Sequence, residues 1–150
     1  MPTKKVVDQA KKDLREGKSA STAAGEFVHE EIEHIREGKH GARSAKQAIA
    51  IGLSKARRAG VPLPPPKTGQ TSEATRHPAE RAYEAGQGKK KAPSRKRSRA
   101  TIRALQREPK RAASSTALSR QAKSAAARRR TRRTTQQPER STRKRTEADA

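Results

Sequence analysis

The chain has 150 residues, of which only 29% are hydrophobic and 1% aromatic, while 35% are charged. Ordinary globular domains are roughly 45–50% apolar, so this composition excludes a single folded domain that fills the whole chain. Lysine and arginine outnumber aspartate and glutamate by 38 to 15, a net charge of +23, and such self-repulsion calls for a polyanionic partner.

The first sixty residues carry the periodicity of three amphipathic helices, because apolar side chains recur there three, four and seven positions apart. The predicted apolar faces are Val6, Val7, Ala10 and Leu14; Ala24, Val28, Ile32 and Ile35; and Ala45, Ile49, Gly52, Leu53 and Ala56, with Glu26, Glu30, Glu33 and Glu37 on the solvated face opposite the second.

The ends of these helices have their own signals. Gly17, Gly38 and Gly60 each follow a segment, where a helix favours glycine in the left-handed conformation. Ser44, with Gln47 three residues later, forms a capping-box start for the third helix. We therefore predict a small all-α head of about three short helices over residues 1–60.

The tetrapeptide REGK occurs at 15–18 and again at 36–39, which suggests a degenerate helix–turn repeat of about 21 residues. Large apolar side chains are few, and domains of about 60 residues are marginal, so we expect a weakly stable head. A homodimer or a protein partner bound through the head would bury more surface. Ile51, off the apolar face, is either such a contact or one exposed isoleucine.

Residues 61–88 are electrically neutral, with three basic and three acidic side chains. The sequence GVPLPPPKTG cannot continue a helix, and its three consecutive prolines favour an extended polyproline spacer. A short helix over 78–85 would place Pro78 at its first position and Gly86 after its end. We predict a linker that contains this one short helix.

Residues 89–150 hold 22 basic and 4 acidic side chains. Like charges three and four residues apart oppose a free helix, so we predict a long, mostly disordered basic tail. Two stretches, about 97–107 and 115–130, would become helical once their charge is neutralised.

The segment HEEIEH at 29–34 resembles the HExxH motif of zinc proteases only superficially. In HExxH the histidines are four apart, about 40° around a helix, whereas His29 and His34 are five apart, about 140°, and cannot hold one ion together. GQGKKK at 86–91 lacks the residues and the preceding strand of a phosphate-binding loop. The absence of cysteine excludes cysteine-based zinc and iron–sulfur sites, and so small a scaffold supports no catalytic arrangement, so we predict no catalytic site, no metal site and no cofactor.

The basic tail is the strongest functional signal, since runs of cations bind phosphate backbones through counterion release with little sequence preference. The tail has no aromatic residue, and modules that read single strands stack bases on aromatic side chains, so duplex DNA or structured RNA is the expected ligand. The predicted nucleic-acid-binding residues are Lys89, Lys90, Lys91, Arg95, Lys96, Arg97, Arg99, Arg103, Arg107, Lys110, Arg111, Arg128, Arg129, Arg130, Arg132, Arg133, Arg140, Arg143, Lys144 and Arg145.

The third head helix carries cations at both ends and follows another helix, as a recognition helix does. The connection EGKHGAR is longer than usual for that motif, and the second helix is rich in glutamate. Secondary contacts to nucleic acid are predicted at Arg43 and Lys46 at the start of the helix, and at Lys55, Arg57 and Arg58 at its end.

The function expected from these features is sequence-non-specific binding of the nucleic-acid backbone, DNA more than RNA, by a non-enzymatic nucleoid-associated or histone-like accessory factor. The alternative is an adaptor whose head docks a protein partner, with the tail adding electrostatic affinity for ribosomes or another polyanion. The first residues have no apolar signal region and the apolar run AIAIGL is too short to span a bilayer, so a cytoplasmic location is expected.

The stretch GEFVHEEIEHIREGKHGARSAKQAIAIGLSKARRAGVPLPPPK, residues 25–67, resembles a family of small basic bacterial proteins that carry only a domain-of-unknown-function label. Its core, GK followed by KQAIAIGLSKAR, is also similar to a short module of small bacterial and phage-encoded proteins. The resemblance covers about residues 4–67 and implies a bacterial source and a helical head. It implies no activity and no site, and the tail lies outside it.

Overall fold

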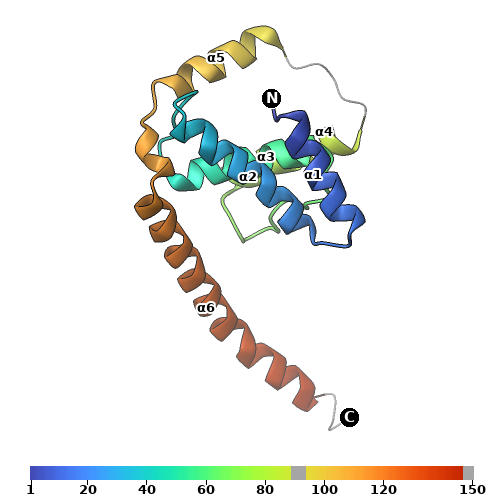
Figure 1. Ribbon diagram of the computed structural model, residues 1–150. Coiled ribbons are helices and arrows are strands. Elements are labelled where there is room, and N and C mark those ends of the chain that lie inside the picture. The colour runs from blue at the N-terminus through green and yellow to red at the C-terminus, as the bar shows by residue number, and fades with distance from the viewer. Residues whose placement is uncertain (89–93, 147–150) are drawn as a thin grey trace. The chain divides into compact units, whose positions relative to one another are not determined.

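The computed structural model describes residues 1–88 and 94–146, and the side chains among these as far as residue 133. The chain divides into two compact units, Met1–Ser114 and a second that begins at Ser115. The regular elements among the described residues are all helices (Figure 1): α1 (Lys4–Arg15), α2 (Ala20–Arg36), α3 (Ala45–Arg58), α4 (Glu73–Gln87), α5 (Arg95–Gln106), the 3₁₀ helix η1 (Lys110–Ala113) and α6 (Ser115–Thr146).

The prediction of an all-α protein is confirmed, and the count of about three helices is wrong. The three predicted helices are α1, α2 and α3, and α4, α5 and α6 follow them. The tail was expected to be mostly disordered, but residues 95–106 and 115–133 within it are helical. No helix among the described residues is long and apolar enough to cross a membrane.

The first three helices end as their glycines predict. Gly17, Gly38 and Gly60 have φ of 77°, 80° and 97°. These values lie in the left-handed region, which is strained for residues that carry a side chain and is open to glycine. After each glycine the chain turns back and donates to a carbonyl of the last helical turn: Lys18 N–H to Asp13 at 2.9 Å, and Lys39 N–H to His34 at 3.0 Å. The two REGK segments are therefore two copies of one helix-ending turn.

Side-chain caps begin these helices. Thr3 accepts from the N–H of Val6, and Ser44 accepts from the N–H of Gln47 at 3.2 Å, as its position predicts. The predicted reciprocal bond of the capping box is displaced by one residue, because Gln47 Oε1 accepts from the N–H of Arg43, at 2.7 Å, instead of Ser44.

The predicted linker helix is longer than expected. α4 begins at Glu73, after Ser72, and carries Pro78 inside it rather than at its first position. Arg76 forms ion pairs with Glu73 and Glu80 on this helix, and such pairs three and four apart support a helix. The turn before Pro78 is therefore helical although proline signals a helix start.

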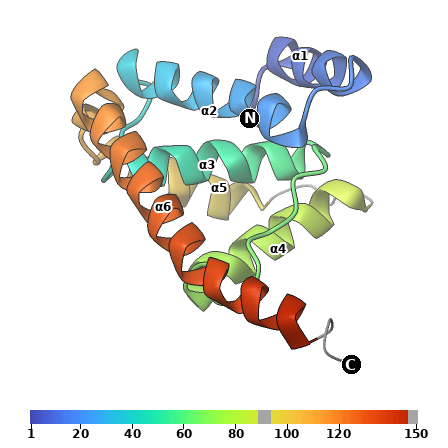
Figure 2. The same cartoon turned by 90° about the horizontal axis from the view of Figure 1, so that it is seen from below.

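The core of the first unit forms where α1, α2 and α3 meet, around the buried Phe27. Consecutive helices pack in turn, α1 on α2, α2 on α3 and α3 on α4, and Figure 2 shows α2, α3 and α4 as successive layers. A Cβ on Gly52 would lie 2.6 Å from the Cα of Val28, so α2 and α3 touch backbone to backbone there.

The first unit reaches well beyond the predicted head. The N–H of Gly41 donates to the carbonyl of Leu105 at 2.8 Å, and the N–H of Ala42 donates to Pro109 at 3.2 Å. Arg36 Nε donates to the carbonyl of the buried Ala113 at 3.1 Å. Residues 105–113, assigned from their charge to a free tail, are thus fastened to the turn between α2 and α3.

The predicted acidic face of α2 is only partly solvated. Glu33 and Glu37 form surface ion pairs with Arg36 and Lys39, but Glu30 is buried and accepts the N–H of Thr3 at 2.8 Å. Burial raises the pKa of Glu30 and the hydrogen bonds from Thr3 lower it, with a net lowering. The helical periodicity of α2 predicted a solvated Glu30. It contains no information on Thr3, the residue before α1 that donates to Glu30 in the folded chain.

Candidate nucleic-acid interface

Helix α5 displays its cations to solvent. Arg95, Lys96, Arg97, Arg99 and Arg103 are all exposed, and no residue of this helix is buried. Neighbouring residues of a helix point about 100° apart, so Arg95, Lys96, Arg99 and Arg103 share one side of the helix within an arc of about 100°, and Arg97 lies outside it. The helix contains no acidic residue and offers no internal partner to its cations.

Helix α6 also displays arginines to solvent, in the second unit. Arg128, Arg129, Arg130, Arg132 and Arg133 are exposed, and three of them are consecutive, so the positive charge runs around the helix. Arg128 Nη2 donates to Ser124 Oγ at 3.4 Å. The stretch 128–133 consists of arginine and threonine alone, so this part of the helix has no apolar side chain to bury.

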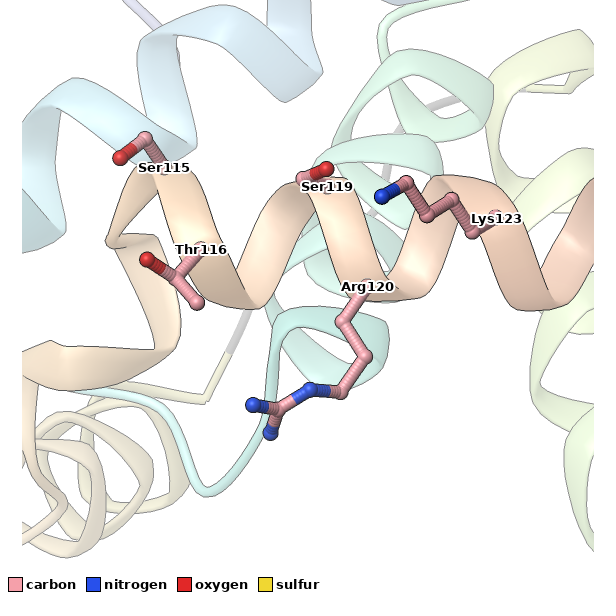
Figure 3. A pocket seen from close by; sticks show the side chains of 5 residues that line it. All are labelled: Ser115, Thr116, Ser119, Arg120 and Lys123. Carbon is pink, nitrogen blue, oxygen red and sulfur yellow. The ribbon is translucent and has the colours of Figure 1, made fainter.

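Ser115, Thr116, Ser119, Arg120 and Lys123 line an open recess along the first turns of α6 (Figure 3). These residues lie four apart in two rows, so hydroxyls and cations share one side of the helix. Both groups donate hydrogen bonds of the kind that phosphate oxygens accept. Arg120 and Lys123 were missed from the sequence because they stand outside the dense runs, although their i, i+3 spacing on a helix was readable.

Other predicted contacts lie at the edge of the first unit or outside the described residues. Arg107, Lys110 and Arg111 are exposed on the segment that is fastened to the α2–α3 turn. Lys89, Lys90 and Lys91 lie outside the described residues. The backbone of Arg140, Arg143, Lys144 and Arg145 belongs to α6, but their side chains are not among those described.

The five secondary contacts predicted on the third helix separate into two kinds. Arg43, Lys46 and Arg58 are exposed, and Nε of Arg43 lies 3.8 Å from Oε1 of Glu108. Nζ of Lys55 lies 2.5 Å from Oε2 of the buried Glu31, so its charge is paired with that carboxylate.

Arg57 is buried and donates from Nε to the carbonyl of Leu63 at 3.1 Å and from Nη2 to Pro64 at 3.4 Å. Burial lowers its pKa. Arg57 therefore holds the proline-rich segment against α3, and this segment is a bound strap rather than a free spacer. A spacing pattern could not separate Arg57 from its exposed neighbour Arg58, because the partner is backbone from the following loop.

The HEEIEH segment supplies a second cluster that the sequence pattern did not identify. His29 is exposed and takes no part in it. His34 instead lies with Glu31 and with His40, a residue beyond the end of α2, and one donor atom from each lies within 4.8 Å of the others. The available signals were the i, i+3 spacing of Glu31 and His34 and the chain reversal at Gly38.

The match to a known protein family lies within the first unit. Residues 15–67 match a family of unknown function (DUF6496), which confirms the resemblance to an uncharacterised family for this part of the chain. No curated protein and no solved structure matches the chain significantly. The matched segment runs from the end of α1 to the strap after α3, and the basic helices α5 and α6 lie outside it.

Proposed function

We propose that this protein is a non-enzymatic factor that binds the phosphate backbone of nucleic acid, DNA more than RNA, without reading its sequence. The cations of α5 and α6 make the contacts, together with Arg107, Lys110 and Arg111. The protein would serve as a nucleoid-associated or histone-like accessory factor in a bacterial cytoplasm.

One observation carries this proposal: the exposed lysines and arginines of α5, and of α6 as far as residue 133, lie on helices that contain no acidic residue in those stretches. Closely spaced exposed cations gain from a polyanion, because binding releases its condensed counterions. The cations on one side of α5 suit a single phosphate strand, and the arginines at 128–133, which point in several directions around α6, suit phosphates on the two walls of a groove.

The aromatic residues support a duplex or a folded RNA as the ligand. Phe27 is buried in the core, and Tyr83 is half-buried on α4. The sequence holds no further phenylalanine or tyrosine and no tryptophan. Base stacking on aromatic side chains is the usual basis of single-strand binding, and this chain lacks the residues for it.

Fluorescence anisotropy of the full chain with a labelled duplex, a single strand and a folded RNA, from about 50 to 300 mM salt, tests the proposal. We expect the duplex and the folded RNA to bind with a log–log salt slope of roughly −5 to −10. Two triple variants, K96Q/R97Q/R99Q on α5 and R128Q/R129Q/R133Q on α6, should each reduce the magnitude of the slope by roughly 3, since each lost phosphate contact removes about one unit.

The variant K4Q/K5Q/K11Q is the matched control, because it removes three exposed cations from α1 and the same formal charge. It should leave the slope unchanged. Equal losses in all three variants would mean that only net charge matters. An unchanged affinity in the α5 and α6 variants would refute the proposal and favour the alternative, an adaptor whose helical head docks a protein partner.

A further inference from the structure

Glu31, His34 and His40 form a compact set of metal-type donors inside the first unit. Glu31 and His34 lie one turn apart on α2, and His40 comes back to them after the turn at Gly38. The Glu31 side chain is fully buried and that of His40 is 14% exposed. Their donor atoms and that of His34 lie within 4.8 Å of one another.

The hydrogen bonds of His40 leave one ring nitrogen directed at Glu31. Nδ1 lies 3.1 Å from the carbonyl oxygen of Gly41, and since a carbonyl only accepts, Nδ1 carries the proton. In the neutral form of the ring, which is the form that binds a metal, the lone pair is then on Nε2, which lies 3.3 Å from Glu31 Oε1. Backbone carbonyls orient metal-binding histidines in this way in many proteins.

Glu31 Oε1 is the unexplained group of the cluster. Among the described residues it is buried without a hydrogen-bond partner, whereas Oε2 is held by Lys55 at 2.5 Å. A buried carboxylate oxygen without a donor costs free energy, and here it faces the nitrogen lone pair of His40. A cation between the two atoms would bind the oxygen, which removes the cost of leaving it unpaired, and would also remove the repulsion between the oxygen and the nitrogen lone pair.

We propose that Glu31, His34 and His40 bind one divalent transition-metal ion of the zinc class, with water as the fourth ligand. Two imidazole nitrogens and one carboxylate oxygen are a donor set that zinc takes in proteins, and the harder magnesium and calcium prefer oxygen alone. At Zn–N and Zn–O distances of about 2.0–2.2 Å the donors of a tetrahedral site are about 3.3 Å apart, so small side-chain rotations close the site.

One neighbouring residue fits this role. Lys55 neutralises the second carboxylate oxygen and leaves Oε1 to the ion. The pairing fixes the orientation of the carboxylate, as outer hydrogen bonds do in metal sites.

The site is structural, because it ties α2 to the turn that holds residues 105–113. His40 is bonded to the carbonyl of Gly41, and the N–H of Gly41 is bonded to Leu105. An ion on His40 therefore fixes the peptide on which the end of α5 is anchored. The folded chain binds the ion more tightly than the unfolded chain, so the metal raises its thermal midpoint.

Titration of Zn²⁺ into the full chain, stripped of metal and competed against a chromogenic chelator, tests the proposal. We expect one ion per chain, and a loss of affinity of about 100-fold or more in His34→Gln and in His40→Gln, because even outer-shell partners are worth 10–100-fold. His29→Gln, on the exposed side of the same helix, and His77→Gln, between Glu73 and Glu80 on α4, are the matched controls and should bind as the parent chain does.

Co²⁺ added to the parent chain gives a second measurement that does not depend on the variants. A four-coordinate ion with nitrogen ligands should give visible absorption bands, and Zn²⁺ should displace them. The proposal is overturned by a chain that shows neither one-to-one zinc binding nor these bands, by His34 and His40 variants that bind normally, or by loss of binding in the His29 or His77 controls.

Discussion

The buried carboxylate of Asp13, in the last turn of α1, accepts a hydrogen bond from the Lys18 ammonium at 2.8 Å, just beyond the turn at Gly17. Gln9 donates to the same oxygen at 2.9 Å. The bond from Lys18 is the largest cause of a lowered pKa at Asp13 and outweighs the effect of burial. This pair closes the first REGK turn with its own side chains.

The stability that Asp13 contributes should depend on pH and be lost in acid. A folded-state pKa below the ordinary value of 3.8 gives stability that is present above that value and is lost as the pH falls through the folded-state pKa. Asp13→Asn should therefore lower the thermal midpoint at pH 7, and the difference from the parent chain should shrink at pH 3 and below. Asp8→Asn, at an exposed position of α1, should show no such pH dependence.

Gly17→Ala should destabilise the first unit by about 1–2 kcal/mol, the cost of the left-handed conformation for a residue with a side chain. A Cβ at Gly17 meets nothing within 4 Å, so the change isolates the backbone cost at φ 77°. Gly25→Ala is the opposite case, since this glycine is helical with open space around it, and should stabilise by about 0.5–1 kcal/mol. Urea unfolding followed by circular dichroism measures both, and equal effects of one sign would contradict the prediction.

Gly52→Ala should be more harmful than its helix propensity suggests. Alanine favours a helix over glycine, but the new methyl would press on the backbone of Val28 from 2.6 Å and force α2 and α3 apart. Overpacking of this kind costs about 1–3 kcal/mol. A variant as stable as the parent chain would show that the two helices can separate freely.

Arg57→Lys should weaken the fold and leave nucleic-acid affinity nearly unchanged. Lysine cannot donate to Leu63 and Pro64 from two nitrogens at once, and unmade hydrogen bonds of buried groups cost about 1–3 kcal/mol. Hydrogen exchange at the amides of Val61 and Leu63 should accelerate, since the other residues of 61–66 are prolines without an N–H. Arg58→Lys, at the exposed neighbour, should change neither stability nor exchange, and a stronger effect on DNA binding at Arg57 than at Arg58 would reverse the assignment.

Several features of this protein were decided by short stretches of sequence. α1, α2 and α3 begin at side-chain caps and end at glycines, and both signals act through hydrogen bonds within one turn. The excess of positive charge in the C-terminal part is likewise a property of composition. These features were predictable because each depends on residues that are neighbours along the chain.

Tertiary structure decided the features that join distant segments. Glu30 is buried where it accepts the N–H of Thr3, and Arg57 is buried under the strap that follows α3. Residues 105–113 are held in the first unit because Gly41 and Ala42 donate to the backbone carbonyls of Leu105 and Pro109. The gathering of Glu31, His34 and His40 likewise needs the chain reversal at Gly38 as well as the helix. A periodic pattern predicts which side of a helix a residue occupies, and only the packing of the folded chain determines which residue it contacts there.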